Sequence, residues 1–321
     1  MLFIKDLLLW IYWNPFKFFI QKIPAPFIYV IAGALADFLY RVCRDKREKL
    51  ELELNFVLRR EANHEENRKM VQDAFKILIC NELEVLVFPV LNVKNICNLV
   101  TCSGLDNLDN SLSNGKGAML LFAHFGANQM VMPAIGYRGY RICQLSAPAT
   151  VWEEVIPDRK FSRMEVRAMK KRWGHELSLP VTHINIFGSL KKAFLCLKRN
   201  EVLGVAIDGG WGKERATISF LGKEALFSIG AVDIARRTGC PVLPTFMVRD
   251  KSGINRMIIE PPLKMDKSGA ANRISSRATQ DFVNRLEMYV NKYPSHYVNF
   301  LALRRFMASK RDRPLFLTGR K

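Results

Sequence analysis

The sequence predicts an α/β fold with a mixed, largely parallel central sheet flanked by helices, and an N-terminal hydrophobic segment that associates with a membrane. Three observations predict it. Short, continuous apolar runs alternate with helical stretches between residues 118 and 260, as strands buried on both faces do in α/β proteins. Residues 1–43 are much more apolar than the rest. The length of 321 residues is ample for one large core.

The N-terminal segment, residues 1–43, contains two apolar runs around residues 7–20 and 27–43. Lys5 and Asp6 flank the first and Lys17 interrupts it. Neither run reaches the roughly 20 uninterrupted apolar residues of a membrane-spanning helix. Trp and Tyr beside Lys are typical of helices that lie in a membrane interface. We therefore expect a membrane-associating segment, and the alternative is a pair of buried core helices. A signal peptide is excluded because the apolar region is too long and is interrupted by Lys and Pro.

The rest of the chain divides into an α/β domain, residues 44–303, and a basic C-terminal tail, residues 304–321. The charged region 44–75 predicts surface helices, and a further helix follows over 71–92. The polar residues 104–117 predict a turn region. The remaining helices are predicted at 158–173, 187–199 and 228–238. The predicted strands are 118–123, 202–207, 241–248 and, as an edge strand, 256–260.

The charge balance points to an anionic partner. Lys and Arg exceed Asp and Glu by 19, which suits nucleic acid, an anionic membrane or an acidic protein. Hydrophobic residues make up 49% of the chain, which excludes global disorder. The mean hydropathy of −0.01 excludes a protein with many membrane spans.

The seven cysteines are odd in number and form no CxxC pair. Most have apolar neighbours in the sequence, which predicts buried free thiols in a reducing compartment. The sequence spacing of Cys and His offers no set of zinc ligands. We therefore expect neither a disulfide scaffold nor a metal site.

Two strand ends carry the candidate chemistry, because ligands of open α/β sheets bind beyond the carboxyl ends of the strands. His124 follows the strand 118–123, where a histidine is suited to act as a general base; the alternative is a hydrogen-bonded loop residue. The strand 202–207 leads into Asp208 and the glycine-rich turn 208–212. Such a turn lets the backbone approach a ligand, and the alternative is a tight turn capped by Asp208.

Several blocks resemble one protein family over nearly the whole chain. They occur in the family's order and include a His-Phe-Gly strand end and an Arg-Thr-Gly-Cys-Pro-Val-Leu-Pro segment. The blocks lie at residues 124–126, 198–204, 208–212, 220–222, 228–230, 237–244 and 260–262. In these blocks the sequence resembles the bacterial lipid A late acyltransferases, the lauroyl/myristoyl transferases of the lysophospholipid acyltransferase superfamily.

The chain departs from this family at four places. Gln129 stands where the family has a carboxylate five residues after the His. Ala147 occupies the place of an Arg, and Gly210 that of the second acid of an Asp-x-Asp turn. Residues 297–300 replace a C-terminal segment rich in Trp and His.

The resemblance implies transfer of a fatty acyl chain from a thioester to a lipid or glycolipid acceptor. His124 would act as general base, and the amide oxygen of Gln129 would accept its ring N–H and fix the tautomer. A different carboxylate is the open alternative, with Glu153, Glu154 and Asp158 as candidates in the following segment. A catalytically degenerate member that binds lipid or acyl carrier protein without turnover is the alternative function.

The resemblance also implies the remaining partners. The substrate-binding candidates are Asp208, Gly209, Gly210, Arg163 and Arg167, where either arginine would replace the missing one. The donor would be acyl carrier protein or acyl-coenzyme A, and no cofactor or metal is expected. The setting would be the anionic cytoplasmic face of the bacterial inner membrane. Nucleic acid ranks below these partners, because the basic residues are dispersed and no binding motif occurs.

Overall fold

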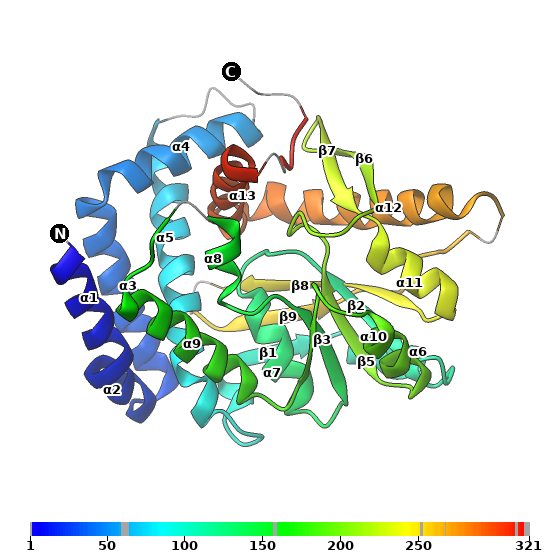
Figure 1. Ribbon diagram of the computed structural model, residues 1–321, viewed down its shortest axis with the longest axis horizontal. Coiled ribbons are helices and arrows are strands. Elements are labelled where there is room, and N and C mark those ends of the chain that lie inside the picture. The colour runs from blue at the N-terminus through cyan, green and yellow to red at the C-terminus, as the bar shows by residue number, and fades with distance from the viewer. Residues whose placement is uncertain are drawn as a thin grey trace.

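The computed structural model describes residues 2–58, 64–156, 159–250, 253–266, 268–311 and 314–317. A sheet of seven strands in the order β1-β9-β8-β2-β5-β3-β4 crosses the molecule (Figure 1). Its strands are β1 (Val100–Ser103), β2 (Ala118–Phe122), β3 (Ile142–Ser146), β4 (Thr182–Asn185), β5 (Val202–Ala206), β8 (Val242–Arg249) and β9 (Asn255–Ile259). A separate hairpin pairs β6 (Arg215–Phe220) with β7 (Lys223–Ser228).

The predicted mixed, mostly parallel sheet is confirmed. Strands β8, β2, β5, β3 and β4 run parallel to their neighbours, whereas β9 pairs with β8 in the antiparallel direction. The strand expected at an edge, β9, lies inside the sheet, because the short strand β1 pairs with it on the outer side. The sequence analysis missed β1, β3, β4 and the hairpin strands β6 and β7, in which polar residues interrupt the apolar pattern.

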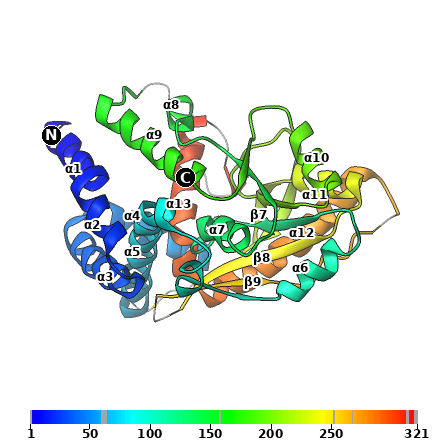
Figure 2. The ribbon, with the colours of Figure 1, turned by 90° about the horizontal axis from the view of Figure 1, so that it is seen from below.

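Helices cover both faces of the sheet, as Figure 2 shows from below. All five residues of β2 are buried. Met119 and Leu121 belong to one core cluster, and Leu120 and Phe122 to the other, as the alternation of side chains along a strand requires. The first cluster contains residues of α10 (Lys191–Lys198), α11 (Gly230–Thr238) and α12 (Ala271–Lys292). The second contains residues of α5 (His64–Val87), α6 (Leu105–Leu112) and α7 (Val131–Gly136).

Three expectations from the sequence differ from the structure. The region 104–117, expected as turns, contains α6, whose apolar Leu108 is buried. The charged region 44–75 and the helix expected at 71–92 are instead α4 (Arg44–Leu58) and the single long α5. The tail expected from residue 304 begins inside α13 (Val298–Arg311), and Arg304 is only 1% exposed. Arg304 is buried because α13 packs against α4 and α5 rather than projecting into solvent, and its guanidinium lies against the turn at Gly210.

The N-terminal segment packs against the domain on one face and exposes apolar side chains on the other. It consists of α1 (Leu2–Ile11), a π-helical turn (Tyr12–Phe16), α2 (Lys17–Lys22) and α3 (Ala25–Val42). Trp13 and Ile20 are buried in the second core cluster, and the Tyr12 hydroxyl donates to the Glu82 carbonyl at 3.0 Å. Large apolar side chains remain exposed at Phe3, Ile4, Leu7, Leu8, Trp10, Ile11, Phe18, Phe19, Phe27, Val30, Phe38 and Val42.

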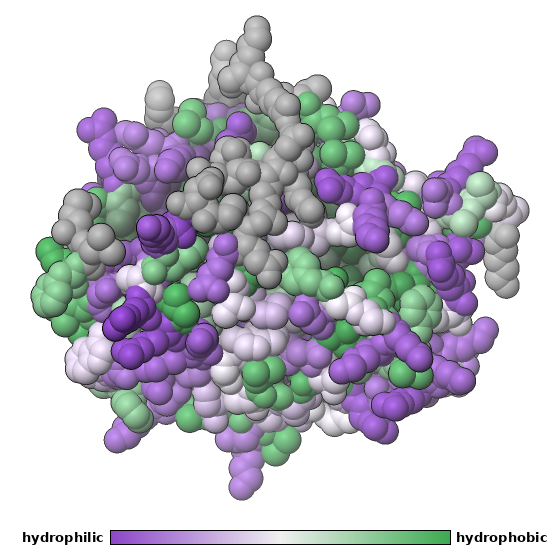
Figure 3. Space-filling model, in the orientation of Figure 1, coloured by the Kyte–Doolittle hydropathy of each residue, from purple (hydrophilic) through white to green (hydrophobic). Residues whose placement is uncertain are grey.

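Hydrophobic residues are visible in Figure 3 at the edge of the molecule that the N-terminal helices occupy. By length and composition, α3 is the described helix that could cross a bilayer, and 28% of it is buried inside the protein. The segment therefore combines the two alternatives of the sequence analysis: one face belongs to the core, and the other is apolar and open.

Candidate active site

His124 leaves the sheet two residues after the end of β2. The loop that carries it lies against β8, and Gly126 makes this close approach possible. Gly126 has a φ of +59°, and a Cβ there would lie 2.0 Å from the Met247 carbonyl oxygen. Only glycine accepts both the backbone conformation and the contact. The Gly126 N–H donates to the His296 carbonyl at 2.9 Å, so the loop position is fixed from two sides.

Asp208 is the carboxylate that meets His124. The two side chains follow the neighbouring parallel strands β2 and β5, whose last residues Phe122 and Ala206 are paired. His124 Nδ1 lies 2.6 Å from Asp208 Oδ1, and the His124 backbone N–H donates to Asp208 Oδ2 at 2.8 Å. The Asp208 side chain is fully buried, whereas the His124 side chain is 38% exposed.

The surroundings keep Asp208 ionised. Burial by itself raises the pKa of the carboxyl, but attraction to His124 and hydrogen bonds from His124 and Tyr297 outweigh burial. The net result is a pKa below the ordinary value of an aspartate. The Tyr297 hydroxyl donates to Asp208 Oδ2 at 2.9 Å. Burial and the nearby Asp208 raise the pKa of this Tyr297 hydroxyl well above its usual value, so it stays a donor.

The C-terminal helix completes the support of the His124 ring. Phe300 of α13 stacks on the imidazole with ring centroids 4.3 Å apart and planes 4° from parallel. Tyr297, which holds Asp208, immediately precedes the same helix. The ring is thus held at Nδ1 by a carboxylate and on one face by an aromatic side chain.

Gln129 does not occupy the place that the sequence analysis expected. Its side-chain oxygen accepts from Arg172 Nη2 at 3.0 Å, while His124 Nδ1 is paired with Asp208. Arg172 of α9 (Arg163–Leu177) also pairs with Glu82 at 2.6 Å and lies 3.7 Å from Glu176. Burial raises the pKa of Glu176 to about 7 despite the nearby Arg172.

The other candidates from the sequence lie elsewhere. Arg163 and Arg167 are exposed on α9 and are not among the described residues that line the active-site cavity; the arginine of α9 that lines it is Arg172. Glu153 is exposed. The side chain of Glu154 and all of Asp158 lie outside the described part of the chain.

The glycine-rich turn after β5 borders the site. Gly209 lines the cavity, and a Cβ there would lie 3.6 Å from His124 Cε1. Gly210 has a φ of +76°, and a Cβ there would lie 2.3 Å from Arg304 Nη1. Any larger residue at 210 would displace the guanidinium of Arg304, which is 1% exposed. The turn is thus tight for a physical reason: a buried cation lies directly behind it.

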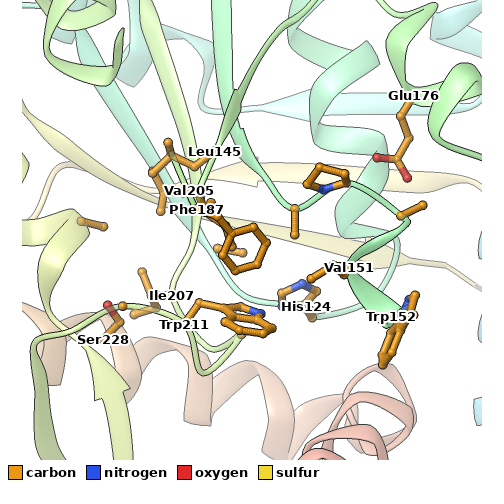
Figure 4. Close-up of a pocket in the computed structure, with 18 of the residues that line it drawn as sticks. His124, Leu145, Val151, Trp152, Glu176, Phe187, Val205, Ile207, Trp211 and Ser228 are labelled. Atoms are coloured by element: carbon orange, nitrogen blue, oxygen red, sulfur yellow. The ribbon is translucent and has the colours of Figure 1, made fainter. Parts of the chain in front are cut away.

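A cavity of about 1380 Å³ opens at His124. Figure 4 shows His124 between two groups of lining residues. On one side lies a mainly apolar branch, lined by Leu145, Phe187, Leu190, Phe194, Val205, Ile207, Ala231 and Ile234, with the charged Asp233 and Arg237 of α11 also on the lining. On the other side, beyond Val151 and Trp152, Glu176 marks a polar branch that also contains Tyr12, Glu82 and Arg172.

In this geometry, one ring nitrogen of His124 is available for proton transfer. Nδ1 is held by the buried Asp208, so Nε2 is the ring nitrogen available to a molecule in the cavity. With the proton on Nδ1, Nε2 is an acceptor. This arrangement can take a proton from a hydroxyl and return it to a leaving group. Sequence reasoning found His124 and Asp208 separately and noted residues 297–300 only as a departure from the family. It missed Arg304 and Arg172, because nothing in the local pattern links them to the strand ends.

A family model described as bacterial lipid A biosynthesis acyltransferase matches residues 2–307, which is nearly the whole chain. No curated protein matches. The matched range includes every residue of the His124 site named above.

Proposed function

Since the chain belongs to the family of bacterial lipid A biosynthesis acyltransferases, we propose that it transfers a fatty acyl chain from a thioester to a hydroxyl of a lipid or glycolipid, with His124 as the general base. The observation that carries this proposal is the pair of His124 and Asp208, 2.6 Å apart, at the junction of an apolar and a polar branch of one cavity. This pair also weighs against a degenerate, non-catalytic role, because it supplies the carboxylate that Gln129 lacks.

The first step is proton abstraction. His124 Nε2 takes the proton of the acceptor hydroxyl as its oxygen attacks the thioester carbonyl carbon. The imidazolium that forms is stabilised by the negative charge of Asp208, which also holds the proton on Nδ1 beforehand. When the tetrahedral intermediate collapses, the carbon–sulfur bond breaks and His124 returns the proton to the departing thiolate. The acyl group is then on the acceptor oxygen, and no acyl-enzyme is formed.

The oxyanion of the intermediate needs donors near His124 Nε2. The turn 208–212 supports this role, because Gly209 lies against the His124 ring and lines the cavity. Backbone N–H groups in such a glycine-rich turn can face a developing negative charge. Arg304, buried behind Gly210, adds a positive field to the turn without touching the substrate. We assign Arg304 and Tyr297 as positioning residues.

The two branches of the cavity suit the two substrates. The apolar branch is lined by aliphatic and aromatic side chains from β3, β5, α10 and α11, which matches a fatty acyl chain. The polar branch offers the Arg172 guanidinium, held by Glu82 and Gln129, to the head of an acceptor. Arginine held by neighbouring acceptors is pre-organised for bidentate recognition of an anionic group.

The surface suits a membrane and an acidic donor protein. Lipid A acyltransferases are membrane-associated, and the exposed apolar face of α1, α2 and α3 provides the contact that an interfacial protein needs. We place this contact on the cytoplasmic face of the inner membrane, where acyl thioesters are made. The net charge of +19 favours acyl carrier protein over acyl-coenzyme A as the donor, because a larger acidic surface gains more from it.

The test uses purified full-length protein, total bacterial membrane lipid, and either radiolabelled acyl carrier protein or acyl-coenzyme A. A new acylated lipid, identified by mass spectrometry, is expected with the wild type and absent with His124→Ala. His183→Ala is the matched control: His183 bonds to Ser146 at 2.9 Å and is not among the described residues that line the cavity, so this variant should retain turnover. Near-normal turnover by a folded His124→Ala variant would refute the proposal.

A further inference from the structure

A second group of reactive side chains lies at the opposite end of the sheet from His124. Cys143 lies near the amino end of β3, Cys196 lies in α10, and Glu201 directly precedes β5. Their Sγ and carboxylate atoms all lie within 4.8 Å of one another, and all three residues are buried. The amino ends of the neighbouring strands β3 and β5 bring Cys143 and Glu201 together, and the end of α10 adds Cys196.

We propose that Cys143, Cys196 and Glu201 bind one Zn²⁺ ion. In tetrahedral zinc sites the Zn–S distance is about 2.3 Å and the Zn–O distance about 2.0 to 2.2 Å, so the sulfur and oxygen ligands lie about 3.5 Å apart. Cys143 Sγ lies 3.6 Å from Glu201 Oε2, at that spacing. Two thiolates and one carboxylate are a donor set that selects zinc over the hard cations Mg²⁺ and Ca²⁺.

The site has an entry path and a place for a fourth ligand. A second cavity, of about 540 Å³, is lined by all three residues and also by Arg141, Lys192 and Arg199. Water from this cavity would complete the tetrahedron, which is the usual arrangement where the protein supplies three ligands. Binding releases the two thiol protons, and the bound ion, two thiolates and one carboxylate then carry a net charge of −1. Arg141 Nη2, 3.1 Å from Glu201 Oε1, balances that charge.

Zinc at this place would fasten α10 to the sheet. Cys196 belongs to α10, while Cys143 and Glu201 belong to the strands beneath it. Phe194, two residues before Cys196, lines the apolar branch of the active-site cavity. The ion would therefore stabilise one wall of that branch without contacting the substrate. This inference stands apart from the proposed acyl transfer and does not depend on it.

The experiment uses the full-length protein, reduced and treated with a chelator, and titrates it with Zn²⁺ and with Co²⁺ as a spectroscopic substitute. We expect one metal ion to bind per chain, and bound Co²⁺ should produce the near-ultraviolet charge-transfer absorption of thiolate ligands. At a hundredfold excess of Zn²⁺ over Kd, the melting temperature should rise by about 4 °C. Cys143→Ser and Cys196→Ser should lose both effects, whereas the matched buried-thiol controls Cys80→Ser and Cys240→Ser should keep them.

A second measurement does not depend on the folding of any variant. The X-ray absorption spectrum of zinc bound to the wild type should report two sulfur neighbours and oxygen neighbours. The proposal is overturned if the wild type takes up no stoichiometric zinc, if both ligand variants bind it as tightly as the wild type, or if the spectrum contains only nitrogen and oxygen neighbours.

Discussion

Replacing Asp208 by Asn tests the reasoning about the active site most directly. The substitution keeps the shape of the side chain and removes its charge. In the native site, Asp208 Oδ1 faces His124 Nδ1 at 2.6 Å. Asp208 Oδ2 accepts two hydrogen bonds, from the His124 backbone N–H at 2.8 Å and from the Tyr297 hydroxyl at 2.9 Å. Both oxygens are therefore acceptors of N–H or O–H donors.

An asparagine can supply only one acceptor oxygen in this position. Because the Oδ2 position meets two donors, the amide oxygen should settle there and turn its NH₂ group toward His124 Nδ1. Nδ1 must then be unprotonated, and the ring proton moves to Nε2, the nitrogen that should accept the substrate proton. In serine proteases the equivalent replacement costs about 10⁴ in kcat through the wrong tautomer. We expect a loss of about 10³ to 10⁴ here, or about 4 to 5.5 kcal/mol of transition-state stabilisation.

The assay is the initial rate of acyl transfer at saturating donor, measured with the wild type, Asp208→Asn and Tyr297→Phe. Tyr297→Phe removes one hydrogen bond to Oδ2 and leaves the charge, so its kcat should fall by only about tenfold. The melting temperature of each variant reports whether the fold is intact. A folded Asp208→Asn variant within tenfold of the wild-type kcat would refute the assigned partnership of Asp208 and His124.

The remaining predictions concern the polar branch, the N-terminal face and the donor. Gln129→Glu should not raise kcat, because residue 129 contacts Arg172 and not the pair of His124 and Asp208. A several-fold rise in kcat would contradict this. Phe18→Ser with Phe27→Ser should weaken flotation with anionic vesicles at an unchanged melting temperature, because both rings are more than half exposed. Trp13→Ala, at a residue only 4% exposed, should instead lower the free energy of unfolding by about 3 to 5 kcal/mol. Affinity for acyl carrier protein should weaken as salt rises from about 50 to 500 mM, and a flat response would contradict electrostatic recruitment. Glu176→Gln should raise the melting temperature at pH 8 but not at pH 4.5. Because the pKa of Glu176 is raised to about 7 in the folded protein, ionisation of Glu176 destabilises the fold as the pH rises toward 7. Below about pH 4.5 the carboxyl is protonated in both the folded and the unfolded protein.

The sequence predicted the strands that consist of continuous apolar runs, and it predicted His124 at the end of one of them. It also placed Asp208 at the end of another. What it could not predict was that β2 and β5 are neighbours, because the pairing of strands depends on packing across the whole sheet rather than on local pattern. The partnership of His124 and Asp208 follows from that pairing alone.

The same limit explains the other misplaced residues. Gln129 was assigned to His124 by its spacing from the family pattern, but the chain turns into a short 3₁₀-helix (Asn128–Met130) and directs the side chain to Arg172. The cysteines at 143 and 196 look unrelated in the sequence, and β3, β5 and α10 bring them together. The buried Arg304 was read as part of a basic tail, because burial of an arginine has no signature in composition.

Tyr297 and Phe300, which support the His124 site, are synthesised late in translation. The ribosome makes the apolar helices within residues 2–42 first, and at roughly 5 to 20 residues per second it reaches residue 300 roughly 13 to 50 seconds later. Throughout that interval α1, α2 and α3 can meet the membrane, while His124 lacks the aromatic ring that stacks on it and Asp208 lacks its tyrosine. The side chains that hold His124 and Asp208 therefore join the site only after the segment with the exposed apolar face has been made.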